Sequence, residues 1–227
     1  MILSIETSTK ICSVALHNKE ALLAETTLHV DKSHSEKLAI LIKDLLSYAD
    51  ISSKELIAVA VAAGPGSYTG LRIGVSSAKG LCYALGIPLI AVNTLEAMAS
   101  GIRKTISEDV FLCPMLDARR MEVYCLLADK DLTILQPSSA KVIEEGSFSK
   151  ELSEHKILFF GNGASKCKPL LGNNENAIFI EDESISAVNV GEVALRKYQE
   201  QQFEDLAYFE PEYLKEFKAI NPKNLFS

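Results

Sequence analysis

The sequence lacks tryptophan, has only four histidines and contains no long apolar run. The histidines form no His-x-x-x-His or His-Glu-x-x-His pair, so the local signatures of zinc sites are missing. A helix that crosses a bilayer needs about 20 mostly apolar residues, and no stretch meets that requirement. We therefore expect no bound metal and no membrane span.

Cysteine pairs are missing as well. The five cysteines are odd in number, form no Cys-x-x-Cys and stand among apolar or small residues, as buried reduced thiols do. Residues 1–6 lack the basic start of a signal peptide, and Glu6 interrupts their apolar run, so we expect a first strand instead. Both observations indicate a cytoplasmic protein.

Positive charge is also in short supply. Lys and Arg number 23 against 30 Asp and Glu, which gives a formal net charge of −7. A protein that binds nucleic acid alone usually neutralises phosphates with Lys and Arg. If RNA is a substrate, we expect another chain to supply the basic surface.

Hydrophobic residues make up 48% of the 227 residues, enough for two small domains or one large one. Alternating and continuous apolar runs predict strands, and apolar residues at helical spacing predict helices capped by serine or ended by glycine. In the first half these patterns predict strands at 1–6, 11–16, 21–30, 57–63 and 89–92, and helices at 33–49 (capped by Ser33 or Ser35), 70–85 and 94–106.

The pattern restarts near residue 108. We predict strands at 110–115, 121–128, 132–135, 140–143 and 157–160, and helices near 148–153, after 161–163 and at 186–201. The sequence therefore predicts an α/β protein with an N-terminal domain (1–107) and a smaller C-terminal domain (108–227). Each has a mixed sheet with flanking helices, and the second repeats the first in reduced form.

Two polar turns are candidate phosphate or nucleotide sites. Glu6, Thr7 and Ser8 follow the first strand, where a carboxylate and hydroxyls can hold phosphate oxygens or hydrated Mg²⁺ or satisfy only turn amides.

The second turn, residues 64–70, joins a buried strand to a helix whose free N–H groups favour an anion. It is neither a Walker loop nor a nucleophile elbow. Its candidate residues are Gly64, Gly66, Ser67 and Thr69, and the alternative is a sharp turn with a serine or threonine helix cap.

Asp117, Arg119 and Arg120 form a charged hairpin that either binds an anion bidentately or pairs its own charges at the surface. We favour the structural interpretation, because exposed ion pairs are common and weak. His34 lies near Asp31, but a helix-capping or exposed histidine explains it better than a metal ligand does.

Several motifs together resemble the TsaB (YeaZ) family. They are Ile5-Glu6-Thr7-Ser8, Gly-Pro-Gly-Ser-Tyr-Thr-Gly-Leu-Arg-Ile-Gly at 64–74, Lys79-Gly80-Leu81, Asp117-Ala118-Arg119-Arg120-x-Glu122-Val123-Tyr124 and Pro211-Glu212-Tyr213-Leu214. The resemblance implies the actin/Hsp70/sugar-kinase-like (ASKHA) fold. It also implies a role in the bacterial machinery that attaches threonylcarbamoyl to N6 of adenosine-37 in tRNAs that read ANN codons.

The same resemblance implies the absence of catalytic residues. The catalytic relative TsaD carries a His-x-x-x-His metal pair at positions that correspond here to Thr94 and Met98. Threonine is a poor metal ligand, and a lone thioether suits only soft metals. We therefore expect a scaffold subunit that acts through TsaD, with TsaE as the ATPase and with tRNA contacted mainly through these partners.

In the family, the first two helices form the interface of a homodimer or of the complex with the catalytic relative. In this sequence the interface residues implied are His34, Leu38, Leu41, Leu45, Leu71, Arg72, Val75, Ala78, Lys79 and Cys82.

The resemblance also bears on cofactors. No cofactor is expected to bind firmly, and ATP or ADP with Mg²⁺ is expected only in the assembled complex.

Two alternatives stay open. The first is an ATP-dependent small-molecule kinase of the same superfamily, with Gly161-Asn162-Gly163 as a weak adenosine-site candidate. The second is a peptidase that acts on its partner, with Ser67 as the most obvious nucleophile.

Overall fold

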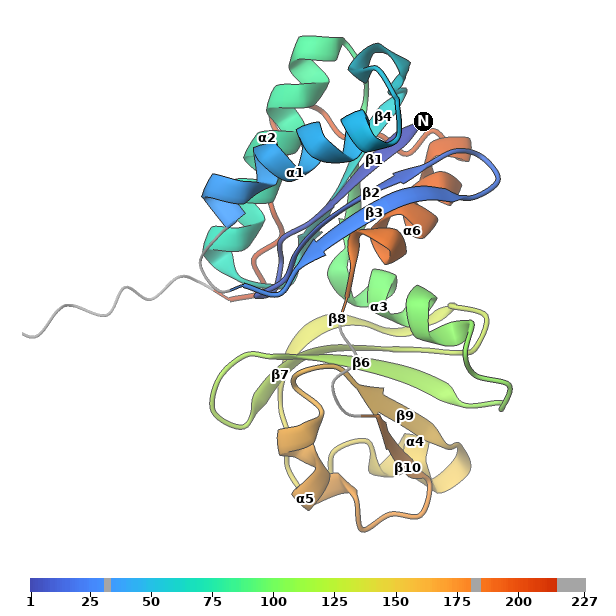
Figure 1. Ribbon diagram of the computed structural model, residues 1–227. Coiled ribbons are helices and arrows are strands. Elements are labelled where there is room, and N and C mark those ends of the chain that lie inside the picture. The colour runs from blue at the N-terminus through green and yellow to red at the C-terminus, as the bar shows by residue number, and fades with distance from the viewer. Residues whose placement is uncertain (31–33, 181–184, 216–227) are drawn as a thin grey trace, which may run out of the picture.

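The computed structural model describes residues 1–30, 34–180 and 185–215. The described strands form two five-stranded sheets, one in each domain (Figure 1). The first sheet has the order β3-β2-β1-β4-β5 and contains β1 (Ile2–Glu6), β2 (Cys12–His17), β3 (Leu22–Leu28), β4 (Ala58–Gly64) and β5 (Leu89–Asn93). The second has the order β10-β9-β6-β7-β8 and contains β6 (Phe111–Asp117), β7 (Glu122–Ala128), β8 (Ile134–Val142), β9 (Ile157–Phe160) and β10 (Ala177–Ile180).

The two sheets have the same strand arrangement. β1 pairs antiparallel with β2 and parallel with β4, and β6 pairs antiparallel with β7 and parallel with β9. The outer pairs also correspond, since β2–β3 and β7–β8 are antiparallel while β4–β5 and β9–β10 are parallel. The second domain therefore repeats the first, as the sequence predicts.

The helices follow the same repeat, but the first two are much shorter in the second half of the chain. The first domain contributes α1 (His34–Tyr48), α2 (Tyr68–Leu85) and α3 (Thr94–Arg103); their counterparts by chain order are α4 (Ser149–Glu154), α5 (Lys168–Leu171) and α6 (Ala187–Gln199). Short 3-10 turns lie at Ser53–Glu55 and Ser165–Cys167. No described helix combines the length and hydropathy needed to span a membrane.

Local sequence explains why these elements form where they do. All seven residues of β4 are buried, because helices cover both faces of its sheet. α2 begins where the Ser67 hydroxyl accepts from the Gly70 amide at 3.3 Å, and it ends at Gly86, whose φ of 66° suits glycine.

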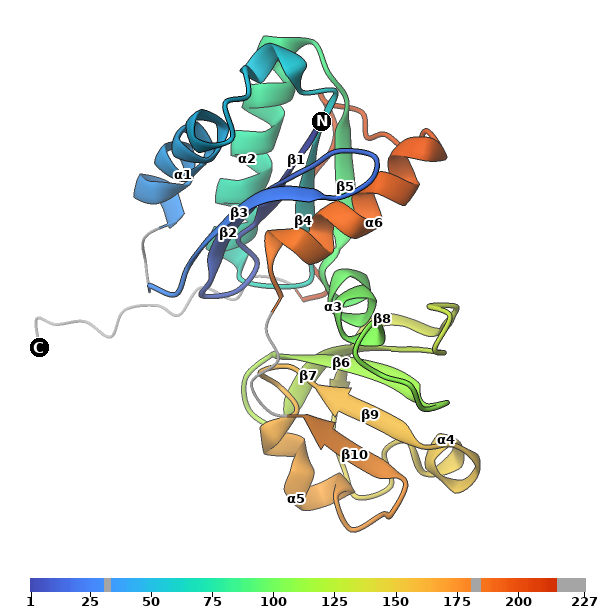
Figure 2. The same ribbon diagram turned by 45° about the vertical axis from the view of Figure 1, so that its right-hand side comes forward.

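Three apolar clusters hold the layers together. One fills the space between the first sheet and the helices α1 and α2, and it includes Leu3, Leu38 and Val75. A second lies between the two domains around α3 and α6, which lie side by side in Figures 1 and 2. The third supports the outer side of the second sheet, around Phe159.

The C-terminal part of the chain returns to the first domain. α6 covers the face of the first sheet opposite α1 and α2, as Figure 2 shows. Residues 204–215, which we call the C-terminal strap, then run along this domain, beginning with a bridge between Glu204 and Leu89. The predicted boundary between residues 107 and 108 thus lies between the two sheets. However, α6 and the strap follow this boundary in the sequence and still contact the first sheet.

Three local predictions differ from the structure, and a fourth falls partly outside the described residues. Residues 132–135 and 140–143 belong to one strand, β8, which follows β7 through two irregularities in register. β10 is absent from the prediction, because a four-residue edge strand gives little pattern. The segment after 161–163 forms only a 3-10 turn and the four-residue α5. The first helix begins at His34, and its proposed cap Ser33 lies outside the described residues.

Candidate functional site

The two polar turns predicted as phosphate sites meet at one edge of the first sheet. Because β1 and β4 are parallel neighbours, with Ile5 opposite Val61, their carboxyl ends lie together. The Glu6–Ser8 turn follows β1, and the 64–70 turn follows β4. The structure therefore brings both candidate segments into one site.

Hydrogen bonds tie the two turns to each other. The Ser67 amide donates to the Ser8 carbonyl at 2.6 Å, and the Thr7 hydroxyl donates to the Gly70 carbonyl at 2.8 Å. Thr7 and Ser8 are buried, whereas Ser67 and Thr69 are exposed. Two of the amides that begin α2, those of Ser67 and Gly70, are thus already occupied.

The glycines of the second turn are needed for this close approach. A Cβ atom at Gly70 would overlap the Thr7 carbonyl oxygen, and one at Gly66 would lie 2.7 Å from the Ser8 Cβ atom. These glycines thus leave room for the first turn, which packs directly against them.

Glu6 is the buried ionisable group of the site. Its Oε1 accepts from the Ser8 amide at 2.6 Å and from the Ser8 hydroxyl at 2.5 Å, while Oε2 has no partner in the described residues. Burial raises the pKa of Glu6 to about 7, and the hydrogen bonds from Ser8 only partly oppose this. Burial, reinforced by the Glu6 charge, raises the pKa of the Cys12 thiol to about 11.

The C-terminal strap covers the other side of the glycine turn. The Glu212 amide donates to the Ala63 carbonyl at 2.8 Å, and its carbonyl lies against Gly64, which has a φ of 122°. The ring of Tyr213 lies 4.8 Å from that of Tyr68. The strap therefore encloses the turn from outside.

Most residues predicted for a partner interface are buried within the chain. His34 donates from Nε2 to the Thr9 and Ile11 carbonyls, at 3.0 and 3.1 Å, and so anchors α1 beside the first turn. It is neither exposed nor placed to bind a metal. The remaining buried ones pack in the core beside the first sheet: Leu38, Leu41, Leu45, Leu71, Val75, Ala78 and Cys82.

Arg72 and Lys79, the two charged residues predicted for the partner interface, make different contacts. Arg72 is exposed, and its guanidinium lies 4.7 Å from the ring centre of Tyr68. Lys79 donates from Nζ to the Phe209 carbonyl at 2.9 Å and to the Ala207 carbonyl at 3.4 Å, which holds the strap.

The outward face of the same helices carries a different set of residues. On α2, Arg72, Ser76, Gly80 and Tyr83 are exposed at helical spacing, with small residues in the middle. On α1, exposed apolar side chains are Ile40, 50% exposed, and Tyr48, 84% exposed. Tyr83 is 83% exposed. Leu46 of the same helix packs partly into the core.

The charged hairpin of the second domain is built around Lys166. Asp117 pairs with Lys166, and its Oδ1 also accepts from the Arg119 amide at 2.9 Å. Partial burial opposes the charge of Asp117, but these hydrogen bonds hold its pKa below the usual value. Arg119 and Arg120 occupy the tip with left-handed φ of 69° and 51°. The ion pair of Asp117 is therefore with Lys166, not with a hairpin arginine.

Thr94 and Met98 lie in the core between the domains. Thr94 is fully buried, and its hydroxyl has no partner in the described residues. The Met98 methyl reaches Gly161, where a Cβ atom would lie 2.6 Å from it and 2.6 Å from the Met115 carbonyl oxygen. The described residues contain no group of three or more His, Cys, Asp or Glu placed to hold a metal. The 161–163 turn, considered for adenosine, thus packs tightly on β6.

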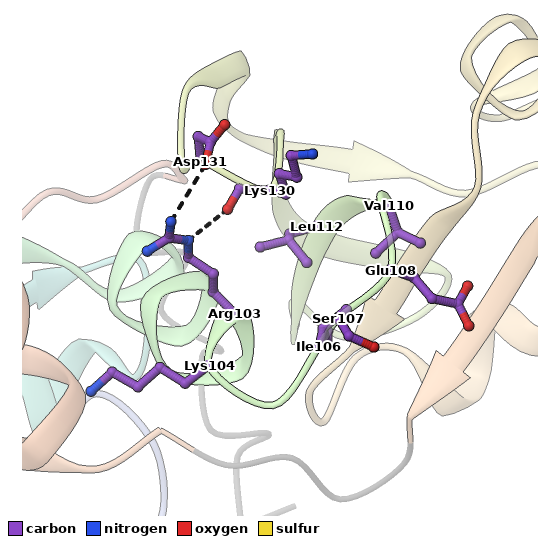
Figure 3. Close-up of a pocket in the computed structure, with 9 residues that line it drawn as sticks. All are labelled: Arg103, Lys104, Ile106, Ser107, Glu108, Val110, Leu112, Lys130 and Asp131. Carbon is purple, nitrogen blue, oxygen red and sulfur yellow. Dashed lines mark hydrogen bonds and ion pairs between the residues drawn. The ribbon is translucent and has the colours of Figure 1, made fainter.

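A small hollow lies at the end of α3, with a volume of about 310 Å³ (Figure 3). Its charged side chains already have partners: Arg103 donates from Nε to the Lys130 carbonyl at 2.7 Å and pairs with Asp131 at 3.4 Å. Lys130 pairs with Asp109 at 3.3 Å. We assign it no ligand.

Local sequence patterns do not predict where two residues lie in the structure. Glu212 reaches the glycine turn from almost 150 positions away, which no local pattern could predict. His17 is buried with both ring nitrogens unpartnered in the described residues, although a histidine at a strand end usually satisfies its nitrogens.

Comparisons with known proteins agree with this architecture. Residues 22–222 match the family model described as "TsaD: tRNA N6-adenosine threonylcarbamoyltransferase". The "tRNA threonylcarbamoyladenosine biosynthesis protein TsaB" of Bacillus subtilis is 33% identical over 173 residues, 75% of this chain and 74% of the relative. The Escherichia coli protein of the same description is 39% identical over 124 residues, which span about half of each chain (54% and 52%).

Solved structures confirm the fold class. "YeaZ from Pseudomonas aeruginosa" superposes with a TM-score of 0.79 at 21% identity, over 94% of this chain and 99% of that one. An activator of 2-hydroxyisocaproyl-CoA dehydratase from Clostridium difficile has a TM-score of 0.52 at 12% identity, covering 88% and 96%. These likenesses show the fold, which is the predicted actin/Hsp70/sugar-kinase-like class with two mixed sheets. The chain belongs to the tRNA N6-adenosine threonylcarbamoyltransferase (TsaD) family and, within it, to the TsaB (YeaZ) proteins.

Proposed function

We propose that this chain is a non-catalytic subunit of the machinery that forms threonylcarbamoyladenosine at position 37 of tRNA. In this account it acts by binding TsaD, with TsaE as a further partner. The observation that carries the proposal is the packing of the two polar turns on each other. In this account the two turns support the fold, because Thr7 and Ser8 pack against the glycine turn and hydrogen-bond to it.

The residues at the two positions of the relative's metal pair support the same role. Thr94 and Met98 are buried and offer one hydroxyl and one thioether, a poor ligand set for a catalytic divalent cation. In this account, ATP or ADP with Mg²⁺ binds only in the assembled complex. The net charge of −7 favours tRNA contact through partners.

We place the partner surface on the outward face of α1 and α2. This surface combines exposed aromatic and aliphatic side chains (Ile40, Tyr48 and Tyr83) with a small-residue ridge at Ser76 and Gly80. Exposed aromatic groups are typical of interface centres, and small residues let a second helix approach closely. The same face serves the homodimer of the isolated chain, so TsaD and a second copy compete for it.

Gly80→Arg tests this surface directly. A Cβ atom at Gly80 meets nothing within 4 Å, so arginine disturbs only a partner, and replacing a helical glycine favours the helix. We expect Gly80→Arg to abolish co-purification with tagged TsaD and to make the isolated chain monomeric in sedimentation.

Gly146→Arg is the matched control, because Gly146 is equally open but lies in the second domain. It should bind TsaD and dimerise like the unmodified chain. Retention of Gly80→Arg by TsaD at the unmodified level would refute the proposed surface.

A further inference from the structure

The C-terminal strap (residues 204–215) contacts the first domain at the polar turns. Its Glu212 amide donates to the Ala63 carbonyl at 2.8 Å, where β4 ends. One residue further on, the ring of Tyr213 lies 4.8 Å from that of Tyr68, in the first turn of α2. The strap is therefore attached to both elements that the glycine turn connects.

The same strap also contacts the second domain. Lys215 pairs with Glu122, the first residue of β7, and donates from Nζ to the Ala118 carbonyl at 3.3 Å. Both contacts lie on the hairpin that joins β6 to β7. The end of the described strap therefore joins this hairpin to the glycine turn of the first domain.

Glu212 takes part in a further link between the domains. Asn93, at the end of β5, donates from Nδ2 to the Ser138 hydroxyl of β8 at 3.0 Å and to Glu212 Oε2 at 3.4 Å. Its Oδ1 accepts from the Leu95 and Glu96 amides and so caps α3. One amide side chain thus contacts the strap, the second sheet and the start of α3.

The two halves of the strap are attached differently. Leu206 and Phe209 pack against the core beside the first sheet, and Lys79 donates to the carbonyls of Ala207 and Phe209. Residues 210–215, which we call the clasp, have no fully buried side chain. The first half is therefore anchored by apolar burial, whereas the clasp depends mainly on polar contacts and one pair of rings.

The contacts of the clasp are few and sensitive to salt. Lys215 and Glu122 expose 37% and 24% of their side chains, and salt weakens an ion pair that is this open to solvent. A single hydrogen bond adds only a small net stabilisation, whereas ordering a segment of chain costs conformational entropy. Segments attached in this way open while the rest of a protein stays folded.

We propose that residues 210–215 form a releasable clasp between the two domains. When closed, it covers the outer side of the glycine turn at Gly64 and joins this turn to the β6–β7 hairpin. When open, it frees both, while the anchored half of the strap, α2 and the two sheets keep their structure. The clasp contacts only this chain, so the inference does not depend on the proposed function.

The absence of tryptophan from the chain allows a direct test. Tyr213→Trp places a single tryptophan on the clasp beside Tyr68, and Tyr213 is 37% exposed, so a larger ring has room. Acrylamide quenching of its fluorescence then measures how far the clasp is open. We expect the quenching constant to rise about twofold when about 0.5 M sodium chloride is added, with no change in far-UV circular dichroism.

Two substitutions in the Tyr213→Trp chain test the contact between the domains. Lys215→Ala and Glu122→Gln remove opposite partners of one ion pair, so each should raise the quenching constant about twofold at low salt and remove most of its salt dependence. Lys156→Ala is the matched control, because it breaks an exposed ion pair with Glu108, 3.2 Å long, at the opposite end of β6. It should behave like the Tyr213→Trp chain.

Equal quenching in the Tyr213→Trp chain and in both ion-pair variants would overturn the proposal. So would a rise in quenching that always accompanies loss of circular dichroism, because the clasp would then open only when the whole chain unfolds. Amide hydrogen exchange of residues 210–215 gives the same comparison without the tryptophan. Exchange should be faster in Lys215→Ala than in Lys156→Ala, and equal rates would contradict the clasp.

Discussion

At the scale of single residues, Glu6 has the clearest physical consequence. Its carboxyl is buried where β1 ends; Oε1 accepts hydrogen bonds from Ser8, and Oε2 has no partner in the part of the chain that the structure describes. Burial raises its pKa from 4.5 to about 7. The folded state therefore binds a proton that the unfolded state has already released between these pH values.

This difference predicts how stability depends on pH. Because the folded pKa lies above the unfolded one, the free energy of unfolding falls as pH rises from 4.5 to about 7, by about 3 kcal/mol in total. Glu6→Gln keeps an oxygen that accepts from Ser8 but cannot ionise, so it should lose this part of the pH dependence. Urea unfolding at pH 5 and pH 8 measures both proteins.

Glu25→Gln is the control, since Glu25 lies exposed on β3 and its substitution should leave the pH dependence of the unmodified chain intact. If Glu6→Gln and the unmodified chain lost stability equally between pH 5 and pH 8, the buried carboxyl would not be the cause.

At the scale of elements, α2 shows how one helix uses glycine in two ways. Gly70 faces the Thr7 carbonyl with no space for a methyl group, whereas Gly80 faces solvent. Glycine is a poor helix former at both positions, but only at Gly70 does the missing side chain allow a close backbone contact. The first turn of α2 thus packs against the polar turn after β1, whereas Gly80, in a later turn, faces solvent.

Alanine substitutions at these two glycines should therefore have opposite effects. Gly70→Ala forces the turns apart and should lower the free energy of unfolding by about 3 kcal/mol. Gly80→Ala should raise it by about 1 kcal/mol through helix propensity. Urea unfolding with a common slope tests both; similar values for the two variants would contradict the packing described here.

Local patterns predict elements well where they are strong. β4 is apolar on both faces, and α2 has a serine cap and a glycine stop, so both appear close to their predicted bounds. β10 has four residues at a sheet edge, and the strap has no periodicity, so neither is visible in the sequence.

The candidate site was only half accessible to prediction. Glu6, Ser8 and Gly66 stand out as turn residues, but their meeting depends on the parallel pairing of β1 with β4. Most of the partner residues implied by the family resemblance lie on the apolar stripes of the two helices, and such stripes mark the face turned to the core. The outward residues, such as Tyr83, interrupt no pattern and were therefore missed.

At the scale of the whole molecule, two similar sheets are joined through α3 and α6, while α1 and α2 stand on the far face of the first sheet (Figures 1 and 2). α6 and the strap belong to the second half of the chain but contact the first sheet, so the first domain needs the C-terminal part to complete it. In this arrangement the outward face of α1 and α2 is exposed, and the two polar turns pack against each other.

Reconstitution of tRNA modification tests the central claim, a non-catalytic subunit that acts through TsaD. Purified TsaD and TsaE are mixed with substrate tRNA, ATP and a threonylcarbamoyl donor, and modified adenosine is measured with and without this chain. We expect modification at least tenfold greater with the chain or its Gly146→Arg variant than without it or with Gly80→Arg, and none from the chain alone. Full modification without this chain, or modification by this chain alone, would contradict the account.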